Sequence, residues 1–387
     1  MSKKKKICAL TTISKTMDWF VTENMRNLAE NGYEVTLICN MEQGFKERNA
    51  DYAKCINISM KRGVCIKDLI TMPFKLERIF KKNKFDIIYY TSPNVSLYSG
   101  IAGKAAGVKN RVYCQYGLRY VSYKGVKRKV FKAAEKLSCS LATTVRSASP
   151  KNRQRVIDSG LCSADKIKVL GIGGTIGVDL KRCDEIDKAD TRKRLRAENN
   201  IPESDFLFGF VGRINADKGI NELIEAFLKL GEERKDVSLC LVGMFDDTNK
   251  VNDELIKKAQ ASEKIFFTGD VPPRQVYSHI AMFDALVHPT YREGFGMVLQ
   301  EAMGMSVPIL TTDVIGASEV VERDKSGLLV KPADVKALKR GMERILSDES
   351  LRLTLAENGR KRAEKHFNRP LMLANILEDL NGILKEN

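Results

Sequence analysis

Several features that identify common classes of protein are missing from this 387-residue chain. No stretch approaches the roughly 18 consecutive apolar residues of a membrane-spanning helix. The nine cysteines are scattered and never spaced as CxxC, so the sequence predicts reduced thiols of a cytoplasmic protein and no zinc site. Aromatic residues make up 7% of the chain and no RNP-like pattern occurs, so nothing indicates a nucleic-acid partner.

The start of the chain resembles a secretion signal only superficially. Lys3 to Lys6 precede the apolar residues Ile7 to Leu10, but this run is short and turns polar at Thr11. No small-residue cleavage site follows it. A first β-strand is therefore the better interpretation.

Positive charge is concentrated in the first half. Residues 1–180 hold 33 Lys and Arg against 14 Asp and Glu, whereas the remainder holds 32 against 35. The chain's net charge of +16 thus arises entirely before residue 181. A nucleic acid, an anionic membrane surface, a phosphorylated substrate or simply a solvated surface would each account for such an excess.

Strand and helix patterns alternate along the chain and predict two α/β domains. Short apolar runs such as 33–39, 86–90, 206–211 and 237–242 have the length and composition of buried strands, and helical patterns separate them. This alternation favours parallel sheets covered on both faces. Residues 183–200 are charged and polar without a strand pattern, so we expect the interdomain linker there. A final helix is expected from Pro370.

The most informative stretch runs from Asp284 to Pro308. An apolar run ending at His288 leads into a turn, and Glu293-Gly294-Phe295-Gly296 precede a segment of high helical propensity that contains Glu301. Glycines allow a ligand to approach the backbone, and a helix N-terminus favours a phosphate. Carboxylates beside a phosphate site suggest a ligand with hydroxyl groups, such as a nucleotide sugar.

Two cations follow the first predicted strand of the second domain. Arg213 and Lys218 lie in the loop from Gly212 to Gly219, just before a helix. A guanidinium group and an ammonium group together would neutralise a diphosphate leaving group without a metal. The absence of a DxD triplet from the whole sequence agrees with metal independence.

Taken together, these motifs resemble the retaining GT-B glycosyltransferases of the GT4 type, which build bacterial capsule, O-antigen and exopolysaccharide. The first half resembles the lipid-carrier subgroup less sharply. The motifs that carry the resemblance are G-R-x4-K-G (Gly212–Gly219), L-V-G (Leu241–Gly243), F-T-G-D-V (Phe267–Val271), H-P-T-x-x-E-G-F-G (His288–Gly296) and E-A-M-x3-V-P (Glu301–Pro308).

The resemblance implies an α/β fold with two Rossmann-like domains that face each other across a cleft. Residues 1–182 would bind the acceptor, residues 183–369 the nucleotide sugar, and residues 370–387 would form a helix that packs back toward the first domain. Glu293, Arg213 and Lys218 would be catalytic, with Glu293 on the donor sugar. Glu301 would bind the ribose hydroxyls. The other implied donor-binding residues are Gly212, Gly243, Met244, Asp270, Val271, Gly294, Phe295, Gly296, Met297 and Val298.

The acceptor side departs from the family pattern. Thr11 to Thr16 stand where many relatives carry a glycine-rich loop, and Gln115 stands where many carry a histidine. Because the three histidines (His279, His288, His366) all lie in the second half, no general base is assigned. We interpret His288 as a structural histidine. The expected acceptor-side residues are Thr12, Ser14, Lys15, Tyr116, Gly117 and Arg119.

No cofactor is predicted. Gly171 to Gly177 loosely resembles a dinucleotide-binding fingerprint, but its glycine spacing is wrong and a polar segment follows it. The expected partners are a nucleotide sugar (UDP rather than GDP or ADP), a glycan or polyprenyl-diphosphate-linked acceptor, and the anionic inner face of the cell membrane. Lys3 to Lys6 and the cluster from Lys124 to Lys132 would make the membrane contact. A nucleotide-sugar epimerase and a non-catalytic sugar-nucleotide-binding partner are the alternatives.

Overall fold

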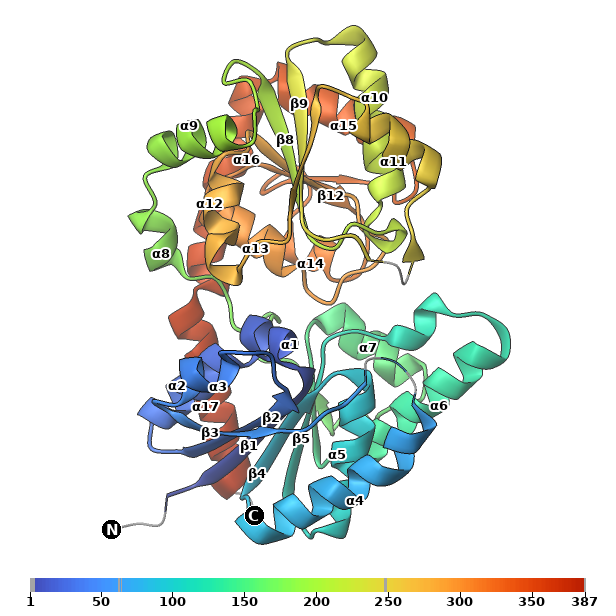
Figure 1. Ribbon diagram of the computed structural model, residues 1–387, viewed down its shortest axis with the longest axis vertical. Coiled ribbons are helices and arrows are strands. Elements are labelled where there is room, and N and C mark those ends of the chain that lie inside the picture. The colour runs from blue at the N-terminus through green and yellow to red at the C-terminus, as the bar shows by residue number, and fades with distance from the viewer. Residues whose placement is uncertain (1–3, 62, 64, 247–248, 386–387) are drawn as a thin grey trace. The chain divides into compact units, whose positions relative to one another are not determined.

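The computed structural model describes residues 4–61, 63, 65–246 and 249–385 and divides the chain into two α/β units (Figure 1). The first unit comprises Met1–Ile176 together with Pro370–Asn387, and the second comprises Gly177–Arg369. Lys3, which belongs to the predicted membrane contact, lies outside the described residues.

The first unit contains a seven-stranded parallel sheet of order β3-β2-β1-β4-β5-β6-β7. Its strands are β1 (Lys6–Ile13), β2 (Glu34–Asn40), β3 (Ala53–Asn57), β4 (Ile87–Thr91), β5 (Asn110–Gln115), β6 (Thr144–Ser147) and β7 (Ile167–Lys168). Its helices are α1 (Ser14–Phe20), α2 (Thr22–Glu30), α3 (Phe45–Asn49), α4 (Ile66–Asn83), α5 (Pro93–Ala105), η1 (Arg119–Ser122), α6 (Gly125–Leu141), α7 (Pro150–Asp158) and α17 (Arg369–Lys385).

Alternation along the central strand β1 places a core on each face of this sheet. Cys8 and Leu10 belong to the core that α4, α5 and α6 cover, whereas Ile7 and Ala9 belong to the core that α1, α2 and α17 cover. Helix α17 is fixed there by Leu380, which is fully buried, and by Asp379, which accepts a hydrogen bond from Arg146 Nε at 2.8 Å. The last helix of the chain therefore completes the first unit.

The second unit contains a six-stranded parallel sheet of order β10-β9-β8-β11-β12-β13. Its strands are β8 (Phe206–Val211), β9 (Val237–Val242), β10 (Ile265–Gly269), β11 (Ala285–His288), β12 (Ile309–Thr312) and β13 (Leu328–Val330). Its helices are α8 (Leu180–Glu185), α9 (Lys188–Glu198), η2 (Ala216–Lys218), α10 (Ile220–Glu233), α11 (Asp253–Gln260), η4 (Pro273–Gln275), α12 (Val276–Ala281), α13 (Met297–Gly304), α14 (Ala317–Val320), α15 (Val335–Ser347), α16 (Glu349–Arg362) and η5 (Ala363–Phe367).

Residues 183–200 do not form the interdomain linker that the sequence had led us to expect. Most of it forms α8 and α9, and the chain enters the second unit earlier, at Gly177. The polar composition is misleading because two of the arginines in this segment pair with Asp284 at the start of β11. Asp284 accepts hydrogen bonds from Arg192 Nη1 at 2.6 Å and from Arg196 Nη2 at 2.7 Å, and the Arg196 side chain is 1% exposed. The buried Arg196 and the partly exposed Arg192 thus anchor α9, through Asp284, to the start of β11.

The expected loop from Thr11 to Thr16 is also absent. Strand β1 continues through Ile13, and α1 begins immediately at Ser14. The β-branched residues Thr11, Thr12 and Ile13 favour an extended backbone, and no glycine interrupts them. The predicted acceptor residues Thr12 and Ser14 therefore lie in regular secondary structure.

Candidate functional site

The candidate site lies at the carboxyl edge of the second unit's sheet. Strands β8 and β11 are neighbours, but the chain leaves β8 for β9 on one side and reaches β12 from β11 on the other. Strand order therefore reverses between β8 and β11, and open parallel sheets bind ligands at such a switch point. Arg213 and Lys218 follow β8, and Glu293 follows β11. The predicted catalytic residues thus come from the two strands that flank the switch point.

Glycines let the loops at this edge lie against one another. Gly243 has a φ of 142°, and a Cβ there would lie 1.9 Å from the Gly212 carbonyl oxygen. Gly219 has a φ of 72°, and a Cβ there would lie 2.0 Å from the Pro289 carbonyl oxygen. Neither position has room for a side chain. The close approach of the Gly219 and Pro289 loops holds Lys218 beside the segment that carries Glu293.

Three side chains meet at Glu293. The Lys218 ammonium donates to Oε2 of Glu293, and His288 Nε2 lies 3.2 Å from the same oxygen. The side chains of Lys218 and Glu293 are 16% and 17% exposed, so the pair is shielded but reachable from solvent. The His288 ring stacks on Phe210 at a centroid distance of 5.3 Å. His288 therefore contacts the candidate site from a buried position, and our interpretation of it as a structural histidine stays a prediction.

The protonation states of these groups follow from their surroundings. Burial opposes the charge on Glu293, but the Lys218 ammonium and the His288 ring more than offset burial and hold the pKa of Glu293 well below its usual range. Burial likewise lowers the pKa of His288 from its usual value, although Glu293 opposes that shift. At neutral pH the site therefore holds an ionised Glu293 beside a neutral imidazole that donates from Nε2.

Arg213 makes a separate ion pair. Its Nη1 contacts Oδ2 of Asp246, which also accepts a hydrogen bond from Asn215 Nδ2 at 3.3 Å. Half of the Arg213 side chain is exposed, so its remaining donors face solvent. Each of the two predicted diphosphate-binding cations thus has a carboxylate partner, and an incoming diphosphate would share or displace that partner.

Glu301 differs sharply from Glu293 in its protonation. It lies in the second turn of α13 and is 7% exposed. Burial raises the pKa of Glu301 from 4.5 to about 7, and the positive charge of Arg369 only partly offsets burial.

The start of α13 is shaped by Gly296, which has a φ of 54°. Phe295 is buried and packs edge-on against Phe367, so it can meet a ligand only through its backbone.

The remaining predicted donor residues follow β9 and β10. Met244 comes directly after Gly243, and Asp270 and Val271 come directly after β10, on the same edge of the sheet. Phe245 is half exposed and stacks on Phe267 at a centroid distance of 5.8 Å. Phe245 and Asp246 were not among the predicted site residues, because their positions become apparent only once β9 is placed beside β8.

The predicted acceptor residues lie in the first unit, in two groups. Thr12, Ser14 and Lys15 belong to β1 and α1, whereas Tyr116, Gly117 and Arg119 follow β5, with β4 between the two strands. The Tyr116 hydroxyl lies 3.1 Å from that of Tyr89, and Arg119 Nε donates to the Tyr123 hydroxyl at 3.2 Å. Thr12 and Ser14 are largely buried.

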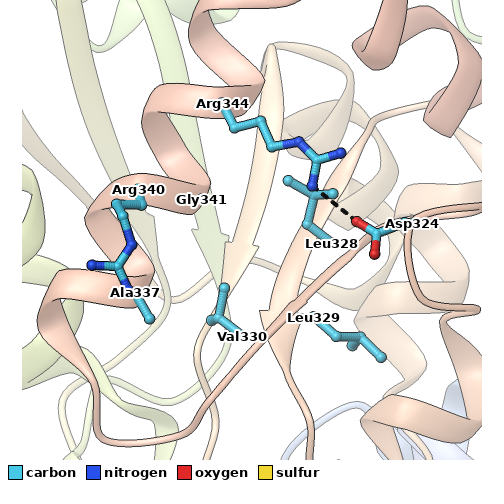
Figure 2. Close-up of a pocket in the computed structure, with 8 residues that line it drawn as sticks. All are labelled: Asp324, Leu328, Leu329, Val330, Ala337, Arg340, Gly341 and Arg344. Carbon is cyan, nitrogen blue, oxygen red and sulfur yellow. Dashed lines mark hydrogen bonds and ion pairs between the residues drawn. The ribbon is translucent and has the colours of Figure 1, made fainter.

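A cavity of about 300 Å³ lies at another place in the second unit (Figure 2). It opens between the edge strand β13 and α15, where Arg344 donates to Asp324 at 3.0 Å. None of the predicted site residues lines it. Its lining consists of Asp324, Leu328, Leu329, Val330, Ala337, Arg340, Gly341 and Arg344.

Within the described part of the chain, none of the helices combines the length and apolar character needed to span a bilayer. All nine cysteines are free thiols, six of them buried.

Comparisons with known proteins assign both units. Residues 191–362 match the family model described as glycosyl transferases group 1, and residues 6–149 match the model described as glycosyl transferase 4-like. The chain is 30% identical to the capsular polysaccharide biosynthesis glycosyltransferase CapM of Staphylococcus aureus, over 100% of this chain and 99% of that protein.

A second relative and a solved structure extend this picture. The UDP-Gal:alpha-D-GlcNAc-diphosphoundecaprenol alpha-1,3-galactosyltransferase of Escherichia coli is 23% identical, over 87% of this chain and 86% of its own. The crystal structure of Anabaena HepE in complex with UDP-glucose matches with a TM-score of 0.81 and 20% identity, covering 97% of this chain and 99% of that one. This structural similarity to HepE shows the fold alone. By sequence, domain architecture and site geometry, this chain belongs to the GT4-type glycosyltransferases of the GT-B fold.

Proposed function

We propose that this glycosyltransferase moves a hexose or N-acetylhexosamine from a UDP-sugar to a polyprenyl-diphosphate-linked glycan, with retention of anomeric configuration and without a metal. The reaction would serve bacterial surface polysaccharide synthesis, in the cytoplasm at the inner face of the cell membrane. The observation that carries this proposal is the Lys218–Glu293 ion pair at the switch point of the second sheet, with Arg213 on the same loop.

The donor occupies the carboxyl edge of the second unit. Lys218 and Arg213 hold the diphosphate, and the backbone amides from Gly294 to Val298 contribute further donors at the start of α13. Glu293 accepts hydrogen bonds from hydroxyls of the donor sugar. Glu301 accepts them from the ribose. The base lies along Asp270 and Val271, and Gly243 and Met244 line the pocket.

Charge stabilisation drives the transfer. The bond between C1 of the sugar and the β-phosphate oxygen breaks, and negative charge accumulates on the leaving diphosphate beside Lys218 and Arg213. The acceptor hydroxyl attacks C1 on the face that the diphosphate leaves, and its proton passes to a diphosphate oxygen. UDP and the retained glycoside are the products. This route needs no histidine base, which agrees with Gln115 at the strand end of the first unit.

Three comparisons support the choice of substrates. The Escherichia coli relative is named for a UDP-sugar and a diphosphoundecaprenol acceptor, and the Staphylococcus aureus relative for capsular polysaccharide biosynthesis. The HepE structure contains UDP-glucose. UDP and a lipid-linked acceptor are therefore the first substrates to test.

A thermal-shift panel of UDP-, GDP- and ADP-sugars tests the donor assignment. The proposal predicts stabilisation by UDP-sugars that persists in EDTA. Stabilisation only by NAD(P), or only in the presence of a divalent metal, would contradict it. The epimerase alternative is tested in parallel, because an epimerase would convert the UDP-sugar with no acceptor present.

A further inference from the structure

Large apolar side chains are exposed mainly on two helices of the first unit. Of the twelve such side chains among the described residues, seven lie on α4 and α6. Ile66, Ile70 and Phe74 are 75%, 61% and 62% exposed, and their i, i+4 spacing aligns them along one face of α4. Val126 and Val130 repeat this spacing on α6. Exposed apolar side chains grouped in this way indicate an interaction surface.

A cavity between α4 and α5 extends the apolar surface. Its volume is about 240 Å³, and its lining is apolar except for one carboxylate. That carboxylate, Glu77, pairs with Lys81 at 2.6 Å. The lining residues are Leu69, Ile70, Pro73, Phe74, Glu77, Ile101, Ala102 and Ala105.

Exposed cations lie on the same two helices as these apolar side chains. The only acid in α6 is Glu135, which is buried, and the first turn of α6 has no acid to offset the positive end of the helix dipole. Lys127 lies 4.3 Å from the ring centroid of Tyr123, and Arg128 lies 6.0 Å from that of Tyr120, which restrains both cations. Exposed cations occur on α4, on α6 and at the residue before α6. They are Lys67, Lys75, Arg78, Lys81, Lys82, Lys124, Lys127, Arg128, Lys129 and Lys136.

Sheet topology places the N-terminal ends of α4 and α6, which carry exposed apolar side chains, at the same edge of the first sheet. Helix α4 follows the carboxyl end of β3, and α6 follows that of β5 after a short connection (Figure 1). Ile66 and Val126 therefore both lie toward the carboxyl edge of the first sheet. Lys5 and Lys6 lie at the opposite edge, where Lys5 donates to Asn381 and Lys6 pairs with Glu34.

We propose that the α4–α6 surface, defined by the apolar and cationic side chains named above, inserts into an anionic lipid bilayer. This proposal rests on the proposed function, because a lipid-linked acceptor requires the enzyme at a membrane. Apolar side chains bury themselves in the acyl region while the cations on the same helices meet lipid phosphates. A second copy of the chain would place like charges opposite one another. Of the seven exposed apolar side chains on α4 and α6, Phe74 alone is aromatic and able to stack on a nucleic-acid base.

Vesicle flotation of the full chain tests the proposal. Vesicles of phosphatidylglycerol and phosphatidylcholine are compared with vesicles of phosphatidylcholine alone. The wild type is expected to float with the anionic vesicles. The variant Ile66→Ser/Ile70→Ser/Phe74→Ser should need on the order of 100-fold more lipid for half-maximal binding. Leu353→Ser removes a similarly exposed apolar side chain in the second unit and should bind like the wild type.

A charge variant separates the electrostatic contribution to vesicle binding from the apolar contribution. Lys124→Gln/Lys129→Gln/Lys136→Gln should weaken binding to anionic vesicles by at least about tenfold at low salt, and by much less at 0.5 M salt. Equal flotation of the wild type and the apolar triple variant would overturn the proposal, and so would failure of the wild type to bind. A wild-type dimer that the triple variant abolishes would assign the surface to a second copy instead.

Transfer to a detergent-solubilised acceptor is measured on the same proteins. Both surface variants should retain this transfer, because none of their altered residues belongs to the donor site. Vesicle binding without any transfer would contradict the proposed function and leave the membrane surface standing. Transfer without vesicle binding would contradict the membrane surface and leave the proposed function standing.

Discussion

Lys218 donates a hydrogen bond to Oε2 of Glu293 from the neighbouring strand's loop. The two residues are 75 positions apart in sequence, yet both lie at the switch point between β8 and β11. In the unliganded protein each group neutralises the other. A donor diphosphate would draw Lys218 toward itself and leave Glu293 free to accept hydrogen bonds from sugar hydroxyls. Donor binding and exposure of the Glu293 carboxylate would thereby be coupled.

Removing the charge of Glu293 should affect transfer far more than binding. We expect Glu293→Gln to lower the transfer rate by about 100-fold or more, because the carboxylate positions the sugar in the transition state. The affinity for UDP should change by less than about fivefold, because the diphosphate contacts are kept. Transfer assays and isothermal titration with UDP measure the two effects.

Glu233→Gln provides the matched control for that variant. Glu233 is an exposed carboxylate on α10 that pairs with Lys339 at 2.9 Å, outside the site loops. Wild-type transfer is expected from the control. If Glu293→Gln were as active as the control, Glu293 would have no part in the reaction.

Removing Lys218 should destabilise the second unit. Lys218→Met leaves the mostly buried Glu293 carboxylate without its cation, at a cost of about 2 kcal/mol in the free energy of unfolding. The double variant Lys218→Met/Glu293→Gln should recover much of that loss, because no unpaired charge remains. Urea unfolding of the four proteins gives the coupling energy. Strictly additive effects would show that the two groups do not interact in solution.

If Glu301 binds the ribose as proposed, its raised pKa should make nucleotide binding depend on pH. Its pKa of about 7 lies above the ordinary 4.5, so the neutral carboxyl favours the folded state and that contribution disappears as the pH rises from 4.5 through 7. Ribose hydroxyls prefer the ionised carboxylate as an acceptor. The affinity for a UDP-sugar, whose diphosphate does not titrate in this range, should therefore rise about tenfold from pH 6 to pH 8.

Glu301→Gln isolates this dependence. Its affinity for the UDP-sugar should vary little between pH 6 and pH 8, and its stability should lose the part of the pH dependence that Glu301 causes. Burial raises the pKa of Glu135 in the first unit to about 7 as well, so only the difference between wild type and variant reports on Glu301. If the affinity and stability of the two proteins varied with pH in the same way, Glu301 would not be the source of the pH dependence.

The buried arginine of α9 should be a structural requirement. Asp284→Ala removes the carboxylate partner of Arg196 and leaves a buried guanidinium without its counterion, so we expect a loss of about 3 kcal/mol in unfolding free energy. Glu357→Ala breaks an exposed pair with Lys361 and should leave the free energy of unfolding nearly unchanged. Chemical unfolding of both variants makes the comparison. A small effect of Asp284→Ala would mean that water replaces the carboxylate.

The sequence predicted the two parallel sheets well because their central strands are short, apolar and continuous. Phe206–Val211 and Val237–Val242 were predicted with the bounds that the structure has. Helix α5 is hard to recognise in the sequence because its small residues are buried on nearly all sides and show no amphipathic period. The edge strand β3 is harder to place from sequence because its residues are only half buried.

The site was less accessible from sequence where it depends on the pairing of distant loops. Glycine spacing and the motif order indicated Lys218 and Glu293, but their contact follows from the adjacency of β8 and β11. His288 precedes a proline and offered no sign of its contact with Glu293. The charged segment of α9 appeared to be a linker because composition does not reveal which charges are buried.

The central claim is that the second unit activates a UDP-sugar for transfer with retention. Proton NMR of the product formed in EDTA from a UDP-α-sugar and a solubilised polyprenyl-diphosphate-linked acceptor tests it most directly. The account predicts a new α-glycosidic anomeric signal in the wild type and none in Glu293→Gln. A β-glycosidic product, or a product that forms only after a divalent metal is restored, would contradict it.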